Sequence, residues 1–291
     1  MKKSLTSLIV ASLVLSSALV CSAEPLIKTG EKIGFMGDSI TQFGAQNPGG
    51  YVRLVESGLA ANGIAITVIP AGISGNKSDQ MLARLDGHII SKKPEWMTLS
   101  CGVNDVWHGA KGIPLEDYKK NITEIITKCE TAGIKVVILT STPINENEND
   151  NNKKLADYNA FLRSLAAEHK LPVADLNADI WAELNNPTMP RPPGTYLTGD
   201  GVHMNPLGDE IMAVGVLKAF GLNEAEIAKA KAAWLDIPKA EVLKGSPKIT
   251  LREYKQLNAL AAQQKKRVSD LVDDAFVIGL KQVLADAPAT K

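Results

Sequence analysis

The sequence predicts an α/β protein in which helices cover both faces of a five-stranded parallel sheet. Two observations support this prediction. Short apolar runs alternate with longer amphipathic segments over most of the chain, and this spacing is typical of right-handed strand–helix–strand crossovers. Polar motifs also follow the first three apolar runs, where the ends of parallel strands would gather them. The strands are expected at residues 32–36, 64–69, 96–101, 135–140 and 171–176.

The helices between these strands are predicted from their amphipathic patterns and their end residues. Ser78 is suited to cap the second helix, and Gly133 follows the third where glycine commonly ends a helix. After a loop rich in proline and glycine, another helix begins near Pro206, a residue favoured in the first turn. The helices are expected at residues 50–61, 78–91, 115–132, 152–169 and 206–220.

Residues 223–291 form a predicted helical extension that follows a main domain spanning residues 24–222. The extension is rich in Ala and Lys, and Thr250 with Glu253 forms a capping box ahead of a long helix. Apolar residues recur at helical spacing from Leu251 to Leu280. A stripe of this kind usually packs against its own protein, so we expect the extension to pack on the main domain.

Residues 1–23 are predicted to be a secretory signal peptide. Two lysines after Met1 precede a short apolar run, and small residues end at Ala23. A membrane anchor is disfavoured because the apolar run is short and rich in serine. A lipid attached to Cys21 is the minor alternative, since bulky Val20 precedes this cysteine. We therefore expect export to the periplasm or the extracellular space, with no stable membrane span after cleavage.

The composition excludes several classes of function. Lys plus Arg and Asp plus Glu both number 32, and no long basic run occurs, so nucleic acid is not an expected partner. The four histidines are scattered and the cysteines lack metal-ligand spacing, so no metal site is indicated. After removal of the signal peptide, Cys101 and Cys129 remain, and we expect two buried free thiols rather than a bridge.

Ser39, Asp200 and His203 supply the parts of a serine hydrolase. Ser39 follows the first predicted strand, in the run Gly37-Asp38-Ser39-Ile40-Thr41, and Asp200-Gly201-Val202-His203 lies far downstream. A serine hydroxyl is a weak nucleophile at neutral pH, so it needs an imidazole base, and the imidazole needs a carboxylate to hold its tautomer. No Gly-x-Ser-x-Gly elbow surrounds Ser39, which argues against an α/β-hydrolase lipase.

Two further motifs follow the second and third predicted strands, namely Ala71-Gly72-Ile73-Ser74-Gly75-Asn76 and Gly102-Val103-Asn104-Asp105. With the Ser39 and Asp200–His203 motifs, they make four blocks whose order resembles the SGNH (GDSL-type) hydrolase family, carbohydrate-esterase-like members included, over residues 33–220. The resemblance implies a flavodoxin-like fold and a chemistry without metal or organic cofactor. It also implies that Ser39 is the nucleophile, that Asp200 and His203 complete a triad, and that Ser39, Gly75 and Asn104 form the oxyanion hole.

Five other residues receive weaker predictions. We expect Asp38 to order the turn of Ser39 and Asp105 to order the third loop. Trp107 and His108 are candidates for binding a sugar ring. Arg84 is interpreted as a solvated or ion-paired helix residue.

The function predicted from these residues is an exported serine esterase that removes small acyl groups, most readily acetyl, from carbohydrate. The expected partner is therefore a small-molecule or glycan ester. Two alternatives stay open: a lysophospholipase or thioesterase that acts on longer acyl chains, and a non-catalytic carbohydrate-binding protein. The second alternative would be favoured by loss of a triad residue, and this sequence retains all three.

Overall fold

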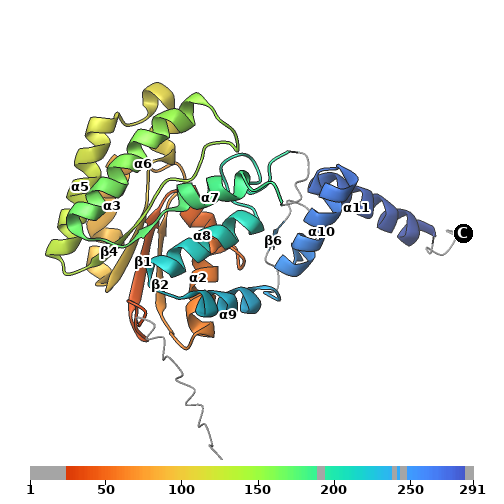
Figure 1. The fold of residues 1–291 in the computed structure, drawn as a ribbon, viewed down its shortest axis with the longest axis horizontal. Coiled ribbons are helices and arrows are strands. Elements are labelled where there is room, and N and C mark those ends of the chain that lie inside the picture. Colours follow the sequence, from red (N-terminus) through yellow and green to blue (C-terminus); the bar gives the residue numbers. More distant parts are fainter. Residues whose placement is uncertain (1–23, 189–193, 238–240, 243–247, 286–291) are drawn as a thin grey trace, which may run out of the picture.

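The structure is a computed structural model that describes residues 24–188, 194–237, 241–242 and 248–285. The predicted signal peptide, with Cys21, lies outside the described residues. Five parallel strands form the central sheet in the order β2-β1-β3-β4-β5, with helices on both faces (Figure 1). This confirms the predicted flavodoxin-like fold. The strands are β1 (Lys32–Gly37), β2 (Thr67–Gly72), β3 (Trp96–Ser100), β4 (Lys135–Leu139) and β5 (Val173–Ala174).

The strand order reverses direction between β1 and β3. The chain leaves β1 for its neighbour β2 on one side and then crosses back to place β3 on the other side of β1. Loops that leave the carboxyl ends of β1 and β3 therefore diverge to opposite sides, and ligands of open α/β sheets bind in the crevice between such loops. Ser39 follows β1 and Asn104 follows β3, so both lie at this switch point.

Two layers of helices enclose the sheet. Helices α2 (Tyr51–Ala61), α8 (Pro206–Ala219) and α9 (Glu224–Trp234) pack together on one side, and α3 (Ser78–His88), α5 (Leu115–Thr131) and α6 (Asp150–His169) pack on the other (Figure 1). The shorter helices of this part of the chain are α1 (Ser39–Gln46), α4 (Val103–Trp107) and α7 (Leu176–Leu184), with 3-10 turns at Ile90–Lys92 and Gly109–Lys111.

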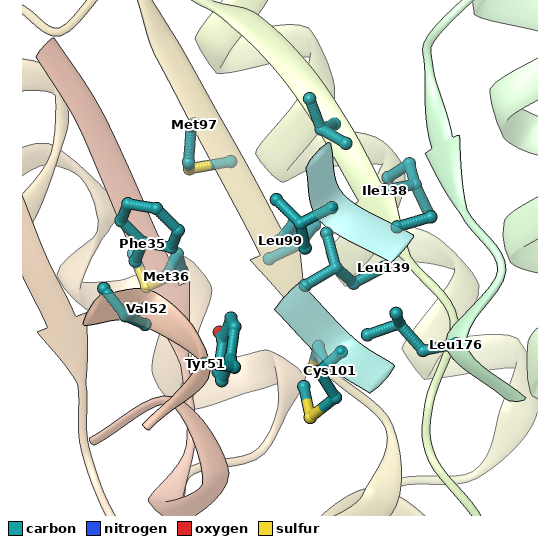
Figure 2. Close-up of a cluster of buried hydrophobic side chains, with 14 of the residues drawn as sticks. Phe35, Met36, Tyr51, Val52, Met97, Leu99, Cys101, Ile138, Leu139 and Leu176 are labelled. Atoms are coloured by element: carbon teal, nitrogen blue, oxygen red, sulfur yellow. The ribbon is translucent and has the colours of Figure 1, made fainter. Parts of the chain in front are cut away.

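The core runs along the central strands. All five residues of β3 are buried, as is expected of a parallel strand that is covered on both faces. Figure 2 shows Phe35, Met97, Leu99 and Ile138 from three neighbouring strands packed in this core. A rigid, close-packed sheet fixes the position of each loop that leaves its carboxyl edge.

Several boundaries differ from the sequence prediction. Strand β2 begins at Thr67 rather than at residue 64, and β5 has only two residues because Asp175 caps α7, its side chain accepting the Ala178 N–H. Helix α1 was not predicted. Ser78 does not cap α3, since Lys77 occupies that position. Gly133 follows α5 with a φ of +73°, as predicted.

Helix α9 belongs to the packing of the main domain, although it lies beyond residue 222. Trp234 at its end is fully buried, and its indole Nε1 donates to the Leu54 carbonyl oxygen of α2 at 3.0 Å. The buried residues of α9 join the same core as the sheet. The helical extension therefore starts with a helix that the main domain holds in place.

Two helices follow α9 among the residues that the structure describes, as expected of a helical extension. They are α10 (Leu251–Gln264), capped by Thr250 and Glu253 as predicted, and α11 (Val268–Ala285). Lys265, in a left-handed conformation, ends α10. Between α9 and α10, β6 (Glu241–Val242) pairs with β7 (Lys248–Ile249), and α10 and α11 project away from the sheet (Figure 1).

The apolar stripe of the extension is more buried in α10 than in α11. Leu251 and Ala261 of α10 are buried, whereas α11 buries Leu271 but leaves Phe276 65% exposed, so the expected packing holds only in part for α11. Within the ranges that the structure describes, no helix has the length and apolar character needed to cross a bilayer. Cys101 and Cys129 are buried free thiols, as expected.

Candidate active site

Ser39, His203 and Asp200 are joined by hydrogen bonds. His203 Nε2 lies 2.8 Å from Ser39 Oγ, and His203 Nδ1 lies 2.6 Å from Asp200 Oδ2. A carboxylate only accepts hydrogen bonds when ionised, so it selects the tautomer with hydrogen on Nδ1 and leaves Nε2 as an acceptor. The arrangement can therefore draw a proton from the Ser39 hydroxyl.

Asp200 is suited to remain ionised. Its partial burial favours the neutral acid, but hydrogen bonds from the His203 ring and from two backbone N–H groups outweigh this effect and lower the pKa of Asp200. Those N–H groups belong to Val202, at 3.0 Å, and His203, at 2.8 Å, and both reach Oδ1. The turn that carries the pair thus holds the carboxylate against the imidazole.

Ser39 is the first residue of α1, and Asp38 is the N-cap of this helix. The Asp38 side chain accepts the Ile40 N–H at 2.9 Å and so caps the helix. A side chain at Gly37 would collide with Thr41, so glycine is required for the sharp turn from β1 into α1. Ser39 is 8% exposed, and its hydroxyl lies at a helix N-terminus, where backbone N–H groups favour a developing negative charge.

Asn104, on α4, contacts the same turn from the other side of the switch point. Its Nδ2 donates to Asp38 Oδ2 at 3.0 Å and to the Asn76 carbonyl oxygen at 3.2 Å. Its Oδ1 lies 3.2 Å from His108 Nε2. His108, which was predicted to bind substrate, is therefore in contact with the Asn104 amide and fixes which end of that amide faces Asp38.

Gly75 lies in the loop after β2, between two residues that are tied to the site. Ser74 N donates to the Gln42 side chain of α1 at 2.7 Å, and Asn76 accepts from Asn104. Gly75 has a φ of +75°, and no atom lies within 4 Å of the position a Cβ would take. Its backbone conformation, which other residues adopt at a cost, is the structural reason for glycine here.

Arg84 is not a solvated or ion-paired residue, which corrects the sequence interpretation. Its half-buried guanidinium donates to the carbonyl oxygens of Gly37 and Ala71, each at 2.8 Å, and to Asn76 Oδ1 at 2.7 Å. It therefore joins the ends of β1 and β2 to the Gly75 loop. Sequence reasoning missed this role because the bonds go to backbone groups distant in the sequence, which leave no local pattern.

Asp38 and Asp105 are both buried carboxyl groups that order the loops, as predicted. Burial raises the pKa of Asp38 to about 6, against the opposing effects of the Ile40 N–H and the charge of His203. Burial likewise raises the pKa of Asp105, whose Oδ1 accepts the N–H and the hydroxyl of Ser78 at 3.0 and 2.6 Å. Asp105 thereby ties α4 to the start of α3.

Two aromatic side chains remain exposed beside these groups. Phe43, one helical turn after Ser39, is 45% exposed, and its ring centre lies 5.1 Å from that of His203. Trp107 is 44% exposed and stacks on His108. Trp107 was a predicted candidate. Phe43 was missed because α1 was not predicted, and the four-residue spacing from Ser39 is the signal that would have found it.

Among the residues that the structure describes, no group of three or more His, Cys, Asp or Glu side chains is placed to hold a metal ion.

Comparison with known proteins identifies the family. Residues 35–211 match the model of the GDSL-like lipase/acylhydrolase family, which covers more than half of the chain. The chain belongs to this family. The match confirms the predicted SGNH relationship and spans the whole region from β1 to the middle of α8.

Several proteins to which the chain is similar are esterases. The chain is 29% identical to an acetylxylan esterase of Geobacillus stearothermophilus over 215 residues, which cover 67% of this chain and 96% of the relative. It is 29% identical to an arylesterase of Vibrio mimicus over 128 residues, covering 43% of this chain and 62% of the relative. The crystal structure of the acetyl xylan esterase AlAXEase superposes with a TM-score of 0.59 at 32% identity, covering 65% of this chain and 98% of the other. The chain is accordingly a carboxylic ester hydrolase.

The raised pKa of Asp38 predicts a pH-dependent contribution to stability. Its ordinary pKa is 3.8, so between about pH 4 and pH 6 the folded protein holds a proton that the unfolded chain has released. Raising the pH through this window therefore destabilises the fold, by about 3 kcal/mol in total because one pKa unit corresponds to about 1.4 kcal/mol. Asp38→Asn should lack this loss, so the difference in free energy of unfolding between variant and wild type should shift in favour of the variant as the pH rises.

Urea unfolding of both proteins at a series of pH values measures this difference. Asp157→Asn, at an exposed position on α6, is the matched control and should follow the wild type. A constant difference between Asp38→Asn and wild type from pH 4 to pH 7 would contradict the shifted pKa.

Proposed function

We propose that this protein is an exported serine esterase that releases acetyl groups from carbohydrate. The observation that supports the proposal most strongly is the hydrogen-bonded chain from Asp200 through His203 to Ser39. The N-terminal sequence, with its lysines, apolar run and small residues, supports export.

In the acylation half of the reaction, Ser39 Oγ attacks the carbonyl carbon of the ester while His203 Nε2 takes the hydroxyl proton. Asp200 stabilises the imidazolium that forms, and it holds the ring in place. The carbonyl oxygen becomes an oxyanion, which accepts hydrogen bonds from the Ser39 and Gly75 N–H groups and from the Asn104 amide. The oxyanion replaces the Asn76 carbonyl as acceptor of the second Asn104 hydrogen. His203 then donates its proton to the sugar oxygen, which leaves as an alcohol.

In the deacylation half, water takes the place of the departed alcohol. His203 removes a proton from this water, which attacks the acyl carbon, and the same donors stabilise the second oxyanion. Collapse returns the proton to Ser39 and releases the acid. Each step uses only the groups already described.

The carbohydrate part of the proposal is supported by the relatives and by the exposed aromatic rings. Two of the proteins to which the chain is similar are acetylxylan esterases. Phe43 is 45% exposed and its ring contacts the imidazole that protonates the leaving group, so a sugar alcohol that departs from this imidazole would leave close to the Phe43 ring. Flat aromatic surfaces with apolar character are suited to contact the faces of sugar rings.

Removing the nucleophile tests the proposal directly. Ser39→Ala should lower acetate release from acetylated xylo-oligosaccharides on the order of 10⁴-fold or more, because the covalent route is lost. The far-ultraviolet circular dichroism and the melting temperature should stay close to those of the wild type, since only a small hydroxyl is removed. An active Ser39→Ala protein would contradict the assignment of the nucleophile.

The Asn104 amide is expected to act mainly in the transition state. Asn104→Ala should lower kcat by roughly a hundredfold or more on p-nitrophenyl acetate, because one donor to the oxyanion is lost. Steady-state kinetics with purified protein measures this. Asn62→Ala, at the end of α2, is the control for loss of a part-buried amide outside the site. Equal kcat for Asn104→Ala and wild type would remove Asn104 from the oxyanion hole.

The acyl preference separates this proposal from a lipid or thioester hydrolase. We expect kcat/KM to be higher for p-nitrophenyl acetate than for the octanoyl ester, because two proteins to which the chain is similar are acetylxylan esterases and the side chains bonded at Ser39 and Asn104 are polar. The two esters share one leaving group, so their comparison isolates the acyl chain. A marked preference for octanoyl would overturn the acetyl assignment.

A further inference from the structure

The segment that carries Asp200 and His203 has little regular structure of its own. Residues 194–205 contain no helix or strand apart from one isolated bridge between Thr198 and Met204. Two backbone bonds close the segment on itself, Gly199 N to the His203 carbonyl oxygen at 2.8 Å and Asn205 N to that of Leu197 at 3.0 Å. These bonds shape the segment, but they do not fix its position relative to Ser39 on the sheet edge.

Glu146 fixes this position from the loop between β4 and α6. Its carboxylate accepts the backbone N–H groups of three consecutive residues, Tyr196, Leu197 at 2.8 Å and Thr198 at 2.7 Å. It also accepts the Thr198 hydroxyl at 2.7 Å. Hydrogen bonds to an ionised acceptor are stronger than neutral ones, and consecutive N–H groups that point to one anion form a nest. The Glu146 side chain thus ties three consecutive residues of the segment to the β4–α6 loop, while Asn205 ties the carbonyl groups of Tyr196 and Thr198 to the start of α8.

The anchor extends to the turn between Asp200 and His203. Thr198 Oγ1, which donates to Glu146, in turn accepts the Gly201 N–H at 3.0 Å. The neighbour of Glu146 contacts the same turn, since Asn145 N donates to the Gly201 carbonyl oxygen at 2.7 Å. Gly201 has a φ of +96°, and a side chain there would collide with the Asn145 amide. The β4–α6 loop therefore holds the Gly201 carbonyl directly and the Gly201 N–H through the Thr198 hydroxyl.

We propose that Glu146 is a positioning residue for the catalytic pair, holding Asp200 and His203 at the distance from which His203 reaches Ser39. This inference rests on the proposed function of those three residues. Glu146 touches none of the reacting atoms and acts through the backbone of residues 196–201. All four of its partners are donors, so the site requires a carboxylate. A glutamine could satisfy the three donors to Oε1, but its NH2 group would then face the Tyr196 N–H.

Kinetics of Glu146→Ala and Glu146→Gln test the proposal. A displacement of about 1 Å in a catalytic group costs roughly a hundredfold in rate, so Glu146→Ala should lower kcat on p-nitrophenyl acetate by about that factor with little change in KM. Glu146→Gln should lie between Glu146→Ala and wild type. Glu148→Ala, two residues further along the same loop and exposed, is the matched control and should keep the wild-type kcat.

Two further measurements separate positioning from a purely structural role. The 2.6 Å bond between His203 Nδ1 and Asp200 should give a far-downfield proton resonance in the wild type, and this resonance should weaken or vanish in Glu146→Ala. Melting temperatures of all variants establish that kinetics are measured on folded protein. A Glu146→Ala protein that melts lower but keeps the wild-type kcat and resonance would overturn the inference, as would unchanged kinetics of both Glu146 variants.

Ser39→Ala, assayed in parallel, distinguishes failure of this inference from failure of the proposed function. If Ser39→Ala is inactive and the Glu146 variants keep full kcat, only the role of Glu146 is wrong. If Ser39→Ala stays active, the proposed function itself is wrong.

Discussion

The hydrogen bond between His203 Nε2 and Ser39 Oγ joins two residues that are 164 positions apart. Neither residue belongs to the sheet, so the bond forms only if two separate segments are each held in place. Ser39 is held because α1 starts directly at the end of β1, where Asp38 caps it and Arg84 binds the Gly37 carbonyl. His203 is held because its turn is bonded to the loop after β4. The parallel sheet supplies the common frame, since it brings the carboxyl ends of β1 and β4 to one edge.

Asp200 and Asp38, the two carboxyl groups near this bond, have different surroundings and therefore different roles. Asp200 is half-exposed and receives hydrogen bonds from His203 and the backbone, so its pKa is lowered and it stays charged against the imidazole. Asp38 is 2% exposed and burial raises its pKa to about 6. It serves the architecture of the turn, capping α1 and accepting the Asn104 amide. Environments that shift two acids in opposite directions are common where acids have separate roles.

Much of the fold could be predicted from the sequence because the apolar runs of β1, β3 and β4 are short, continuous and separated by long amphipathic helices. Ser39, Asp200 and His203 could be grouped because a serine nucleophile needs an imidazole and a carboxylate, whereas Gly75 and Asn104 were singled out by the resemblance of the four blocks to the SGNH family. The prediction failed where tertiary contacts decide. Helix α1 begins at Ser39, directly after β1, where no helix was predicted. Strand β5 ends early because Asp175 caps α7, and β2 begins three residues after its predicted start.

Arg84 and Glu146 show most clearly what local patterns do not reveal. Each is an ordinary charged residue in sequence, on a helix and on a loop respectively. Most of their partners are backbone carbonyl and N–H groups of segments 13 to 52 residues away, which any sequence could supply. Only the fold brings these groups within hydrogen-bond distance, so their roles can be assigned from the structure alone.

Mapping the site of a fluorophosphonate adduct tests the central bond between Ser39 and His203 most directly. The wild-type protein and His203→Ala are reacted with the probe over time, digested, and the modified peptide is identified and quantified by mass spectrometry. We predict an adduct on Ser39 in the wild type, formed roughly a hundredfold or more slowly in His203→Ala because the base that activates the hydroxyl is gone. An adduct on another residue, or equal rates in the two proteins, would contradict the account.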